Sequence, residues 1–201
     1  MALILLAAGH SRRFGDADKL MVELGGVPVG LHAARRLSGR VWRRKLAVVG
    51  SEGLRPELEA LGFEVLRSAS GARAGMGDNL ALAARHLEGC DGALVCLADM
   101  PFVPLTHAEA LLSRLGGNST IAISAAGKHK SPPVAFDFSH FKALQSLSGD
   151  EGARRIIAAA GVEIAEVPTT PDALFDIDTP DDLAAARELW RSAQTSFQGG
   201  T

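Results

Sequence analysis

The sequence has few cysteines, little excess charge and no long apolar run, and each shortage excludes a class of protein. Two cysteines, Cys90 and Cys96, are too few for a disulfide framework, and Cys96 lies in an apolar run that predicts a buried thiol. The 21 basic residues are balanced by 23 acidic ones, so no general electrostatic attraction favours nucleic acid or an anionic membrane. We expect a cytoplasmic protein. Any polyanion that it binds must be bound by a local group of residues, not by the overall charge.

No stretch predicts a membrane span, a signal peptide or a second domain. The opening run, residues 1–9, is too short to cross a bilayer and has no basic residues ahead of it. Internal repeats and low-complexity linkers are absent. We therefore expect a single domain over residues 1–192, followed by a small, polar and disordered tail over residues 193–201.

Short apolar runs alternate with amphipathic segments along the chain, as expected of βαβ units. This pattern predicts an α/β fold of three layers, a mostly parallel sheet with helices on both faces. Strands are expected at 2–6, 45–49, 63–67, 93–98, 120–125, 133–137 and 162–167.

Three helices can be placed from their own signals. In 78–88, apolar residues recur at helical spacing and predict one buried face, formed by Leu80, Ala83, Ala84 and Leu87. Thr106 and Glu109 form a capping-box pattern, which predicts a helix start at Thr106. Thr179 followed by Pro180 and Asp182 predicts a helix whose first residue is the proline.

Glycine and positive charge gather directly after the first predicted strand, in "LILLAAGHSRRFGDADK". Gly9 and Gly15 allow backbone amides to approach an anion, and Arg13 and Lys19 can neutralise phosphate oxygens. A glycine turn with a solvated basic face is the alternative. Neither the dinucleotide-binding pattern G-x-G-x-x-G nor the P-loop pattern is present.

Two other predicted strands end in acidic residues. Asp99 follows the strand at 93–98 and precedes Pro101, a place where a carboxylate can hold Mg²⁺ that also bridges substrate phosphates, although a cap or turn role is the alternative. Asp176 and Asp178 alternate with apolar residues and should point to one side, so either could complete the metal's oxygen shell. Asp181 and Asp182 suit a helix N-terminus.

Five stretches together resemble the MobA-like nucleotidyltransferases, and especially the molybdenum cofactor cytidylyltransferase branch. The resemblance runs from about residue 3 to residue 190. It is carried by "LLAAGHSRRFGDADKL", "GMGDNLALA", "LADMPFV", "SPPVAFDFSHFKALQSLSGDEGARRII" and "FDIDTPDDL". It implies a nucleotide-diphospho-sugar transferase fold, dependence on Mg²⁺, and transfer of a nucleoside monophosphate from a nucleoside triphosphate to a phosphorylated acceptor with release of pyrophosphate.

The resemblance also implies roles for residues. Arg13 would hold the β and γ phosphates, Lys19 the α-phosphate and the charge of the transition state, and Asp99 the metal, with Asp178 as second ligand. The family signature continues to a lysine, and this chain has one additional residue between Gly15 and Lys19. The remaining nucleotide-binding residues would be Leu6, Ala7, Ala8, Gly9, His10, Ser11, Gly15, Gly75 and Asn79.

The choice of base follows from the same resemblance. The guanylyltransferase branch tends to have glycine where this chain has Ala8, and the extra methyl group could exclude a purine, so CTP is favoured over GTP. "GMGDNL" replaces a loop that usually carries hydroxyl groups. Asn79 at a helix start can bind an anion or a base amide, whereas Asp78 would repel a phosphate.

The acceptor is expected at the segment "AGKHKSPPVAF", where the family commonly has a glycine-rich turn. Lys128, His129 and Lys130 form the sharpest local basic cluster and suit an anionic acceptor, with Pro133 beside them. A solvated lysine loop is the alternative. The stretch 149–154 resembles a family segment, but its residues by themselves indicate only a loop that enters a helix.

The favoured function is transfer of CMP to a molybdopterin-type cofactor, with a molybdoenzyme or its maturation factor as a protein partner. An acceptor phosphate needs no strong base, which agrees with the lack of a Ser-His-Asp or Cys-His pattern; His10, His32 and His86 are interpreted as structural or solvated. Alternatives are a molybdopterin guanylyltransferase, a sugar- or polyol-phosphate cytidylyltransferase, and a non-catalytic nucleotide- or cofactor-binding protein.

Overall fold

The computed structural model describes residues 1–9, 14, 18–68, 74–116, 119–159 and 163–198. All seven strands expected from the sequence are present, and a short hairpin, β2–β3, adds to them. The elements are β1 (Ala2–Ala7), β2 (Glu23–Leu24), β3 (Val27–Pro28), α1 (Val29–Leu37), β4 (Arg44–Val49), α2 (Arg55–Ala60), β5 (Glu64–Arg67), α3 (Met76–Ala84), β6 (Gly92–Leu97), α4 (Leu105–Ser113), β7 (Ser119–Ala126), β8 (His129–Asp137), η2 (Phe138–His140), α5 (Phe141–Gln145), η3 (Gly149–Glu151), α6 (Arg154–Ala159), β9 (Glu163–Pro168), η4 (Asp172–Leu174) and α7 (Pro180–Gln198).

One sheet contains seven of these strands, in the order β5-β4-β1-β6-β8-β7-β9. Neighbouring strands are parallel except at β8, which runs antiparallel to both β6 and β7. β1 is buried on both sides because all six of its residues are apolar, as is usual for a central parallel strand. The predicted mostly parallel α/β sheet is confirmed.

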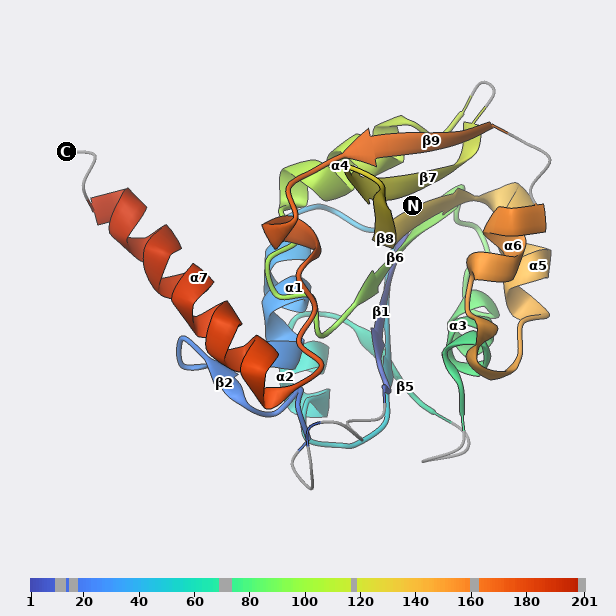
Figure 1. Ribbon diagram of the computed structural model, residues 1–201. Coiled ribbons are helices and arrows are strands. Elements are labelled where there is room, and N and C mark those ends of the chain that lie inside the picture. The colour runs from blue at the N-terminus through green and yellow to red at the C-terminus, as the bar shows by residue number, and fades with distance from the viewer. Residues whose placement is uncertain (10–13, 15–17, 69–73, 117–118, 160–162, 199–201) are drawn as a thin grey trace.

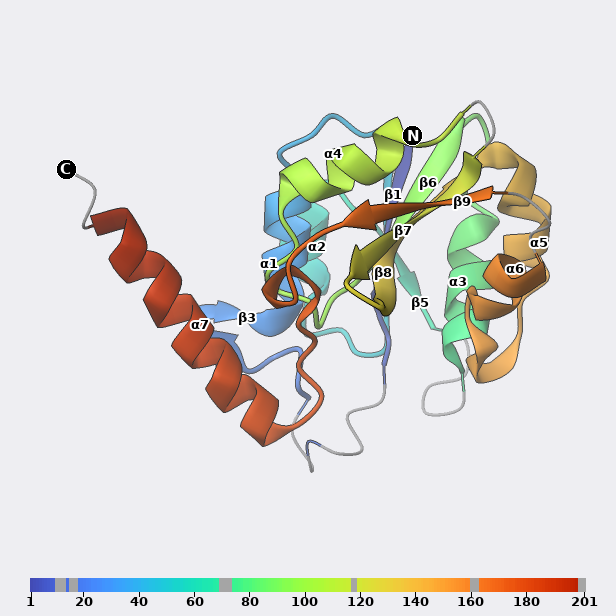
Figure 2. The same cartoon turned by 45° about the horizontal axis from the view of Figure 1, so that its top comes forward.

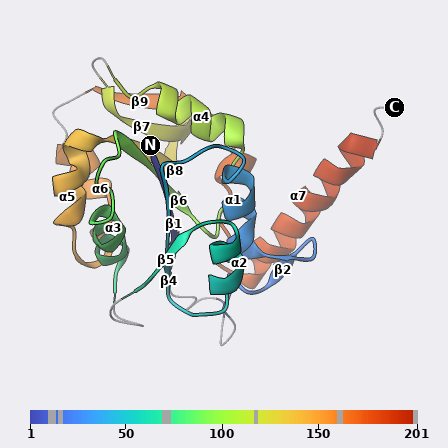
Figure 3. The same ribbon diagram turned by 180° about the vertical axis from the view of Figure 1, so that it is seen from behind.

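Helices cover both faces of the sheet, so the molecule has three layers. In Figure 1, α3, α5 and α6 lie on one side of the sheet and α1, α2, α4 and α7 on the other, and the reverse view in Figure 3 agrees. Figure 2 shows α4 lying across β7 and β9. The helices therefore cover the faces of the sheet, and the ends of the strands are where loops can form a site.

The side chains of β1 alternate between two apolar clusters, one on each face. Leu3, Leu5 and Ala7 belong to the cluster beneath α1, α2 and α4, and Ala2, Ile4 and Leu6 to the cluster beneath α3 and α5. Period-2 alternation on a strand produces this division. Both cysteines are buried, as predicted for Cys96, and burial raises the pKa of the Cys96 thiol to about 12.

The start of α7 is as predicted, with Pro180 as its first residue. Thr179 Oγ1 accepts a hydrogen bond from the Asp182 amide (3.1 Å), and the Asp182 carboxylate accepts one from the Thr179 amide (2.8 Å). Each side chain therefore satisfies a backbone donor that the helix leaves open. Asp182 acts as a cap, in the position near the helix N-terminus that the sequence indicated.

The start predicted for α4 is wrong by two residues, because Thr106 was expected to cap the helix. The helix begins at Leu105, and its cap is Pro104, without a side-chain hydrogen bond. The Pro104 carbonyl accepts from the amides of His107 and Ala108, so the first turn is already closed before Thr106 could act as a cap. Thr106 is the second residue of the helix.

The bounds of α3 also differ from the predicted 78–88. The helix begins at Met76 because the Asp78 carboxylate accepts a hydrogen bond from the Gly75 amide (2.9 Å), and it ends at Ala84. The four residues of the predicted apolar face, Leu80, Ala83, Ala84 and Leu87, are all buried. The periodic pattern thus identified the face correctly and the ends approximately.

The helix α7 continues to Gln198, so residues 193–198 are helical and the predicted disorder is wrong for them. A helix that is already formed extends at the low cost of fixing one residue per new hydrogen bond, and no glycine or proline interrupts it before Gly199. Neither α7 nor any other helix in the described ranges is long and apolar enough to cross a membrane.

Candidate active site

The carboxyl ends of three central strands lie side by side. The Ala98 amide donates to the Leu6 carbonyl (3.0 Å), and the Gly50 amide donates to the Ala7 carbonyl (3.3 Å). The turn after β1 therefore emerges between the turns that follow β4 and β6. In open α/β sheets, ligands bind at this edge.

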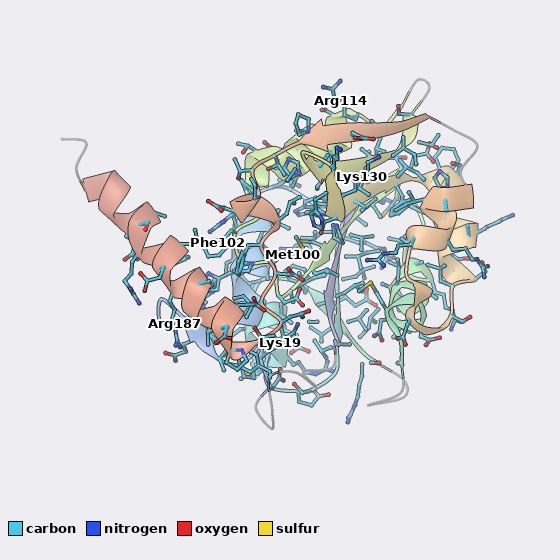
Figure 4. The ribbon with its side chains drawn as sticks, viewed as in Figure 1. Lys19, Met100, Phe102, Arg114, Lys130 and Arg187 are labelled. Atoms are coloured by element: carbon cyan, nitrogen blue, oxygen red, sulfur yellow. The ribbon has the colours of Figure 1, made fainter. Side chains whose placement is uncertain are left out.

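Three side chains that are far apart in the sequence meet at this edge. The ammonium group of Lys19 lies 2.7 Å from Asp99 Oδ2 and 2.7 Å from Asp178 Oδ1. The Lys19 side chain is only 5% exposed, whereas 18% of Asp99 and 33% of Asp178 is exposed. Figure 4 shows Lys19 close to where the chain enters α7. The structure thus brings together the predicted catalytic lysine and both predicted metal ligands.

The position of Lys19 is set by its neighbour, Asp18. Asp18 Oδ1 accepts from the Leu20 amide (3.0 Å), and Asp18 Oδ2 accepts from Ser51 Oγ (2.9 Å). The first bond forms a local Asx turn, and the second ties that turn to the end of β4. The sequence analysis assigned no role to Asp18 or Ser51. An aspartate two residues before the amide that donates to it is a recognisable turn signal, whereas the partner Ser51 is not predictable locally.

The segments that carry Asp99 and Asp178 are joined to each other. The Ile177 amide donates to the Asp99 carbonyl (3.0 Å), so the chain before α7 runs alongside the turn after β6. The rings of Phe102 and Phe175 meet edge to face, with centroids 6.4 Å apart. These contacts hold the two carboxylates at a common point, facing Lys19.

Lys19, Asp99 and Asp178, here called the Lys19 cluster, lie close enough for their charges to act on one another. Burial acts to lower the pKa of Lys19, but the charges of Asp99 and Asp178 and their hydrogen bonds outweigh it, so that pKa lies above its ordinary value. Burial raises the pKa of the Asp99 carboxyl, and Lys19 offsets part of this effect. A cation facing Asp99 therefore favours the charged form of its carboxyl.

The donor atoms of the Lys19 cluster suit a hard divalent cation. Two carboxylate oxygens converge on one positive group, and Asp99 Oδ1 is buried and accepts no hydrogen bond from the described part of the chain. Mg²⁺ prefers such oxygens and commonly retains waters and phosphate oxygens as further ligands. No group of three or more acidic, histidine or cysteine side chains forms a complete metal site within the described residues. Asp99 and Asp178 therefore fit a metal that arrives with a nucleotide.

Other predicted residues at this edge are described in part. Leu6, Ala7 and Ala8 are buried, and Gly9 is exposed. Asp176 is exposed, and its charge acts on Asp99, but Asp178 is the aspartate that contacts Lys19. Four predicted residues lie outside the described ranges: His10, Ser11, Arg13 and Gly15.

Two predicted nucleotide-binding residues, Gly75 and Asn79, lie at the first turn of α3. Both are buried, and the Asn79 amide donates to the Gly75 carbonyl (3.2 Å). The carboxylate of Asp78, expected to repel a phosphate, is engaged by the Gly75 amide. The turn lies against the sheet face opposite to α1 and α2 (Figure 3).

The predicted acceptor-binding residues lie at the β7–β8 hairpin. Lys128, His129 and Lys130 are exposed, and Lys130 forms an ion pair with Glu166 of β9. Lys130 is separate from Lys19 in Figure 4. Pro133 is buried in β8, where its carbonyl accepts a hydrogen bond from Ser124 (2.7 Å). The structure thus does not join these four residues to the Lys19 cluster.

His32 and His86 each have a partner within the fold. His32 is buried, and its Nε2 donates to the Leu24 carbonyl (2.9 Å). His86 Nδ1 lies 2.8 Å from a carboxylate oxygen of Glu64. The sequence analysis interpreted both as structural or solvated, and the contacts agree.

One solved structure shows how widely the fold is shared. A protein of Mycobacterium tuberculosis, solved as a complex with manganese, superposes with a TM-score of 0.73 at 20% identity, over 93% of this chain and 97% of that one. At this identity the similarity shows the fold alone. The nucleotide-diphospho-sugar transferase fold implied by the sequence resemblance is confirmed.

Sequence comparison identifies the family. Residues 3–165 match the model of the MobA-like NTP transferase domain. The purine catabolism protein PucB of Bacillus subtilis is 31% identical over 92% of this chain and 94% of its own length. A molybdenum cofactor guanylyltransferase of Cereibacter sphaeroides is 31% identical over 94% of this chain and 96% of its own length. The chain is a nucleotidyltransferase and belongs to the MobA-like NTP transferase family.

Proposed function

We propose that this chain transfers CMP from CTP to the phosphate of a molybdopterin-type acceptor. An acceptor phosphate oxygen would attack the α-phosphorus of the nucleotide, and the bond from that phosphorus to the bridging oxygen of pyrophosphate would break. The observation that carries this proposal is the buried Lys19, held between Asp99 and Asp178 at the carboxyl edge of the sheet. The acceptor is already anionic, so no general base is needed.

The positive and negative residues of the Lys19 cluster would have different roles. Lys19 would contact the α-phosphate and stabilise the charge that develops as pyrophosphate leaves. Asp99 and Asp178 would hold Mg²⁺, which neutralises phosphate charge when bound. Support for a divalent cation comes from the manganese complex of the structural relative and from the buried Asp99 Oδ1, which accepts no hydrogen bond from the described residues.

The residues after β1 would hold the triphosphate. Gly9 is exposed at the carboxyl edge, and glycine permits close approach of backbone amides to phosphate oxygens. Arg13, Ser11 and His10 belong to this part of the proposal from the sequence resemblance. Arg13 would supply positive charge to the phosphates that leave.

The preference for CTP depends on Ala8. Its side chain is in the apolar cluster beneath α3, and a Cβ placed on Gly50 would lie 3.8 Å from it. The methyl group therefore fills space between the ends of β1 and β4 that a glycine would leave open. Less room at this point favours the smaller pyrimidine.

Transfer of GMP from GTP is the second candidate. Several relatives, including the one from Cereibacter sphaeroides, are named molybdenum cofactor guanylyltransferases. The acceptor in either case would be a molybdopterin-type phosphate. Lys128, His129 and Lys130 would attract it by their charge. A molybdoenzyme or its maturation factor would receive the product.

Pyrophosphate release tests the proposal directly. The protein is incubated with Mg²⁺, molybdopterin and each of CTP, GTP, ATP and UTP, and phosphate is measured after addition of pyrophosphatase. Release with CTP supports the proposal, and release with GTP alone establishes the second candidate. A protein that binds a nucleotide but releases no pyrophosphate with molybdopterin or with sugar and polyol phosphates would be a binding protein, contrary to the proposal.

A further inference from the structure

Two glycine-containing segments, separated by more than 70 residues, touch through their backbones. A Cβ atom built on Gly75 would lie 2.2 Å from the carbonyl carbon and oxygen of Gly149, and 2.6 Å from the Asp150 nitrogen. A Cβ on Gly77 would lie 2.8 Å from the Gly149 oxygen and 2.9 Å from the Ser148 oxygen. The obstructing atoms are backbone, so neither contact can be relieved by turning a side chain.

The facing segment also depends on glycine. Gly149 has φ of +65° and Gly152 has φ of +54°, both in the region that residues with a side chain rarely adopt. A Cβ on Gly152 would lie 3.1 Å from the sulfur of Met76, the first residue of α3. The turn from Ser148 to Gly152 therefore curves closely around the first turn of α3.

The contact continues along α3. The Gln145 side chain donates to the Ala84 carbonyl at the far end of this helix (3.0 Å), and Leu144 and Leu147 belong to the same apolar cluster as Leu80. Figures 1 and 2 both show α5 beside α3. The segment from α5 to Gly152 thus supports α3 from its last turn to its first.

In the described residues, the first turn of α3 is also supported by its own cap and by apolar packing. Asp78 and Gly75 form its capping box, and Gly75 and Asn79 are buried there. The helix lies against β1 and β4 through apolar contacts such as that of Leu80, which allow sliding more readily than hydrogen bonds do. The close backbone contact with the Ser148–Gly152 turn therefore limits how far the start of α3 can move toward that turn.

We propose that the Ser148–Gly152 turn is a positioning element that holds the first turn of α3 where it binds the nucleoside triphosphate. The proposal rests on the proposed function and assigns a role to the "GDEGAR" stretch, for which the sequence by itself indicated only a loop. Small displacements at a binding site reduce the reaction strongly, because the reacting atoms must be aligned. The turn would act through Gly75 and Asn79 rather than by touching the reacting atoms.

A pair of alanine variants separates positioning from strain. Gly149→Ala is compared with Gly26→Ala, since the two glycines have similar φ values of +65° and +78° and no atom within 4 Å of a built Cβ. Gly26 lies in the β2–β3 turn, away from α3. The two variants should lose similar stability in urea. Only Gly149→Ala should bind the CTP–Mg²⁺ or GTP–Mg²⁺ complex more weakly, by about tenfold or more.

Hydrogen exchange of the same variants makes the test independent of the nucleotide. Amides of residues 76–84 should exchange faster in Gly149→Ala than in Gly26→Ala, in the absence of any ligand. Unchanged exchange over α3 would overturn the proposal, and so would equal nucleotide affinity of the two variants. If the unmodified protein binds no nucleoside triphosphate, the proposed function fails, while the exchange comparison still decides whether the turn positions α3.

Discussion

The Nζ atom of Lys19 lies 2.7 Å from Oδ2 of Asp99, although 80 residues of chain separate them. The same atom lies 2.7 Å from Asp178, a further contact across 159 residues. One buried ammonium therefore occupies the point toward which two carboxylates are directed. The Lys19 ammonium thus lies where a metal ion bound by both carboxylates would also lie. Its positive charge can also attract a phosphate group.

Replacement of Lys19 by methionine keeps an unbranched side chain one atom shorter and removes its charge. Turnover should fall by about 10²-fold or more, the scale expected when one transition-state charge contact is lost. Lys142→Met on α5 is the control, because Lys142 is exposed. A Lys19→Met variant that loses only nucleotide affinity and keeps kcat would assign this lysine to ground-state binding.

The same Lys19→Met variant should bind Mn²⁺ more tightly than the unmodified protein when nucleotide is absent. The ammonium and a metal ion compete for the same oxygens of Asp99 and Asp178, and removal of one competitor favours the other. A change of about tenfold corresponds to roughly 1.4 kcal/mol. Titration with Mn²⁺, followed by its paramagnetic resonance signal, measures this. Equal or weaker binding would show that lysine and metal do not share a position.

Asp99→Asn should abolish turnover while leaving the fold intact. The amide is nearly the same size but carries no charge, so it is a poor ligand for Mg²⁺. Asp91→Asn is a matched control, because Asp91 is exposed and precedes β6 whereas Asp99 follows it. Near-native circular dichroism and undiminished Mg²⁺-dependent turnover in Asp99→Asn would remove this residue from the site.

Stability should fall as the pH drops below about 6.5, the ordinary pKa of histidine. Burial lowers the pKa of His32, and the backbone carbonyls of Leu24 and Val27 offset only part of this effect. Burial also lowers the pKa of His107. The unfolded chain therefore binds protons at pH values where the folded chain does not, and protonation favours unfolding. The free energy of unfolding in urea, measured from pH 7 to pH 5, should show this loss.

His32→Gln should reduce that loss on acidification, because it removes one of the two histidines that are buried in the described ranges. His129→Gln, at an exposed position on the β7–β8 hairpin, should leave the loss unchanged. Equal pH dependence of the two variants and the unmodified protein would contradict the assignment to His32.

Gly25→Ala should destabilise the fold more than Gly26→Ala. Both glycines have positive φ, so alanine at either place costs about 1–2 kcal/mol of backbone strain. A Cβ on Gly25 would also lie 2.3 Å from the Trp190 ring of α7, whereas one on Gly26 meets nothing within 4 Å. Urea unfolding of the pair measures the additional cost of displacing α7. Equal losses would show that Trp190 moves aside freely.

Local sequence pattern determined the strands, the apolar face of α3 and the start of α7. These features depend on residues within a few positions of one another, as in the bonds between Thr179 and Asp182. The same logic located Asp99 and Asp178 at ends of elements, where side chains reach the carboxyl edge. Helix starts were less certain, because Pro104 rather than Thr106 closes the first turn of α4.

Tertiary structure alone decided which of these residues meet. Three sets of contacts join residues more than 30 positions apart. They are the pairing of Lys19 with Asp99 and Asp178, the bond from Ser51 to Asp18, and the contact of Gly75 with Gly149. Such contacts depend on strand order and register, which are set by the packing of the whole sheet. The sequence by itself determined which charged residues are candidates for the proposed chemistry, and the packing of the sheet decided that Lys19, Asp99 and Asp178 meet.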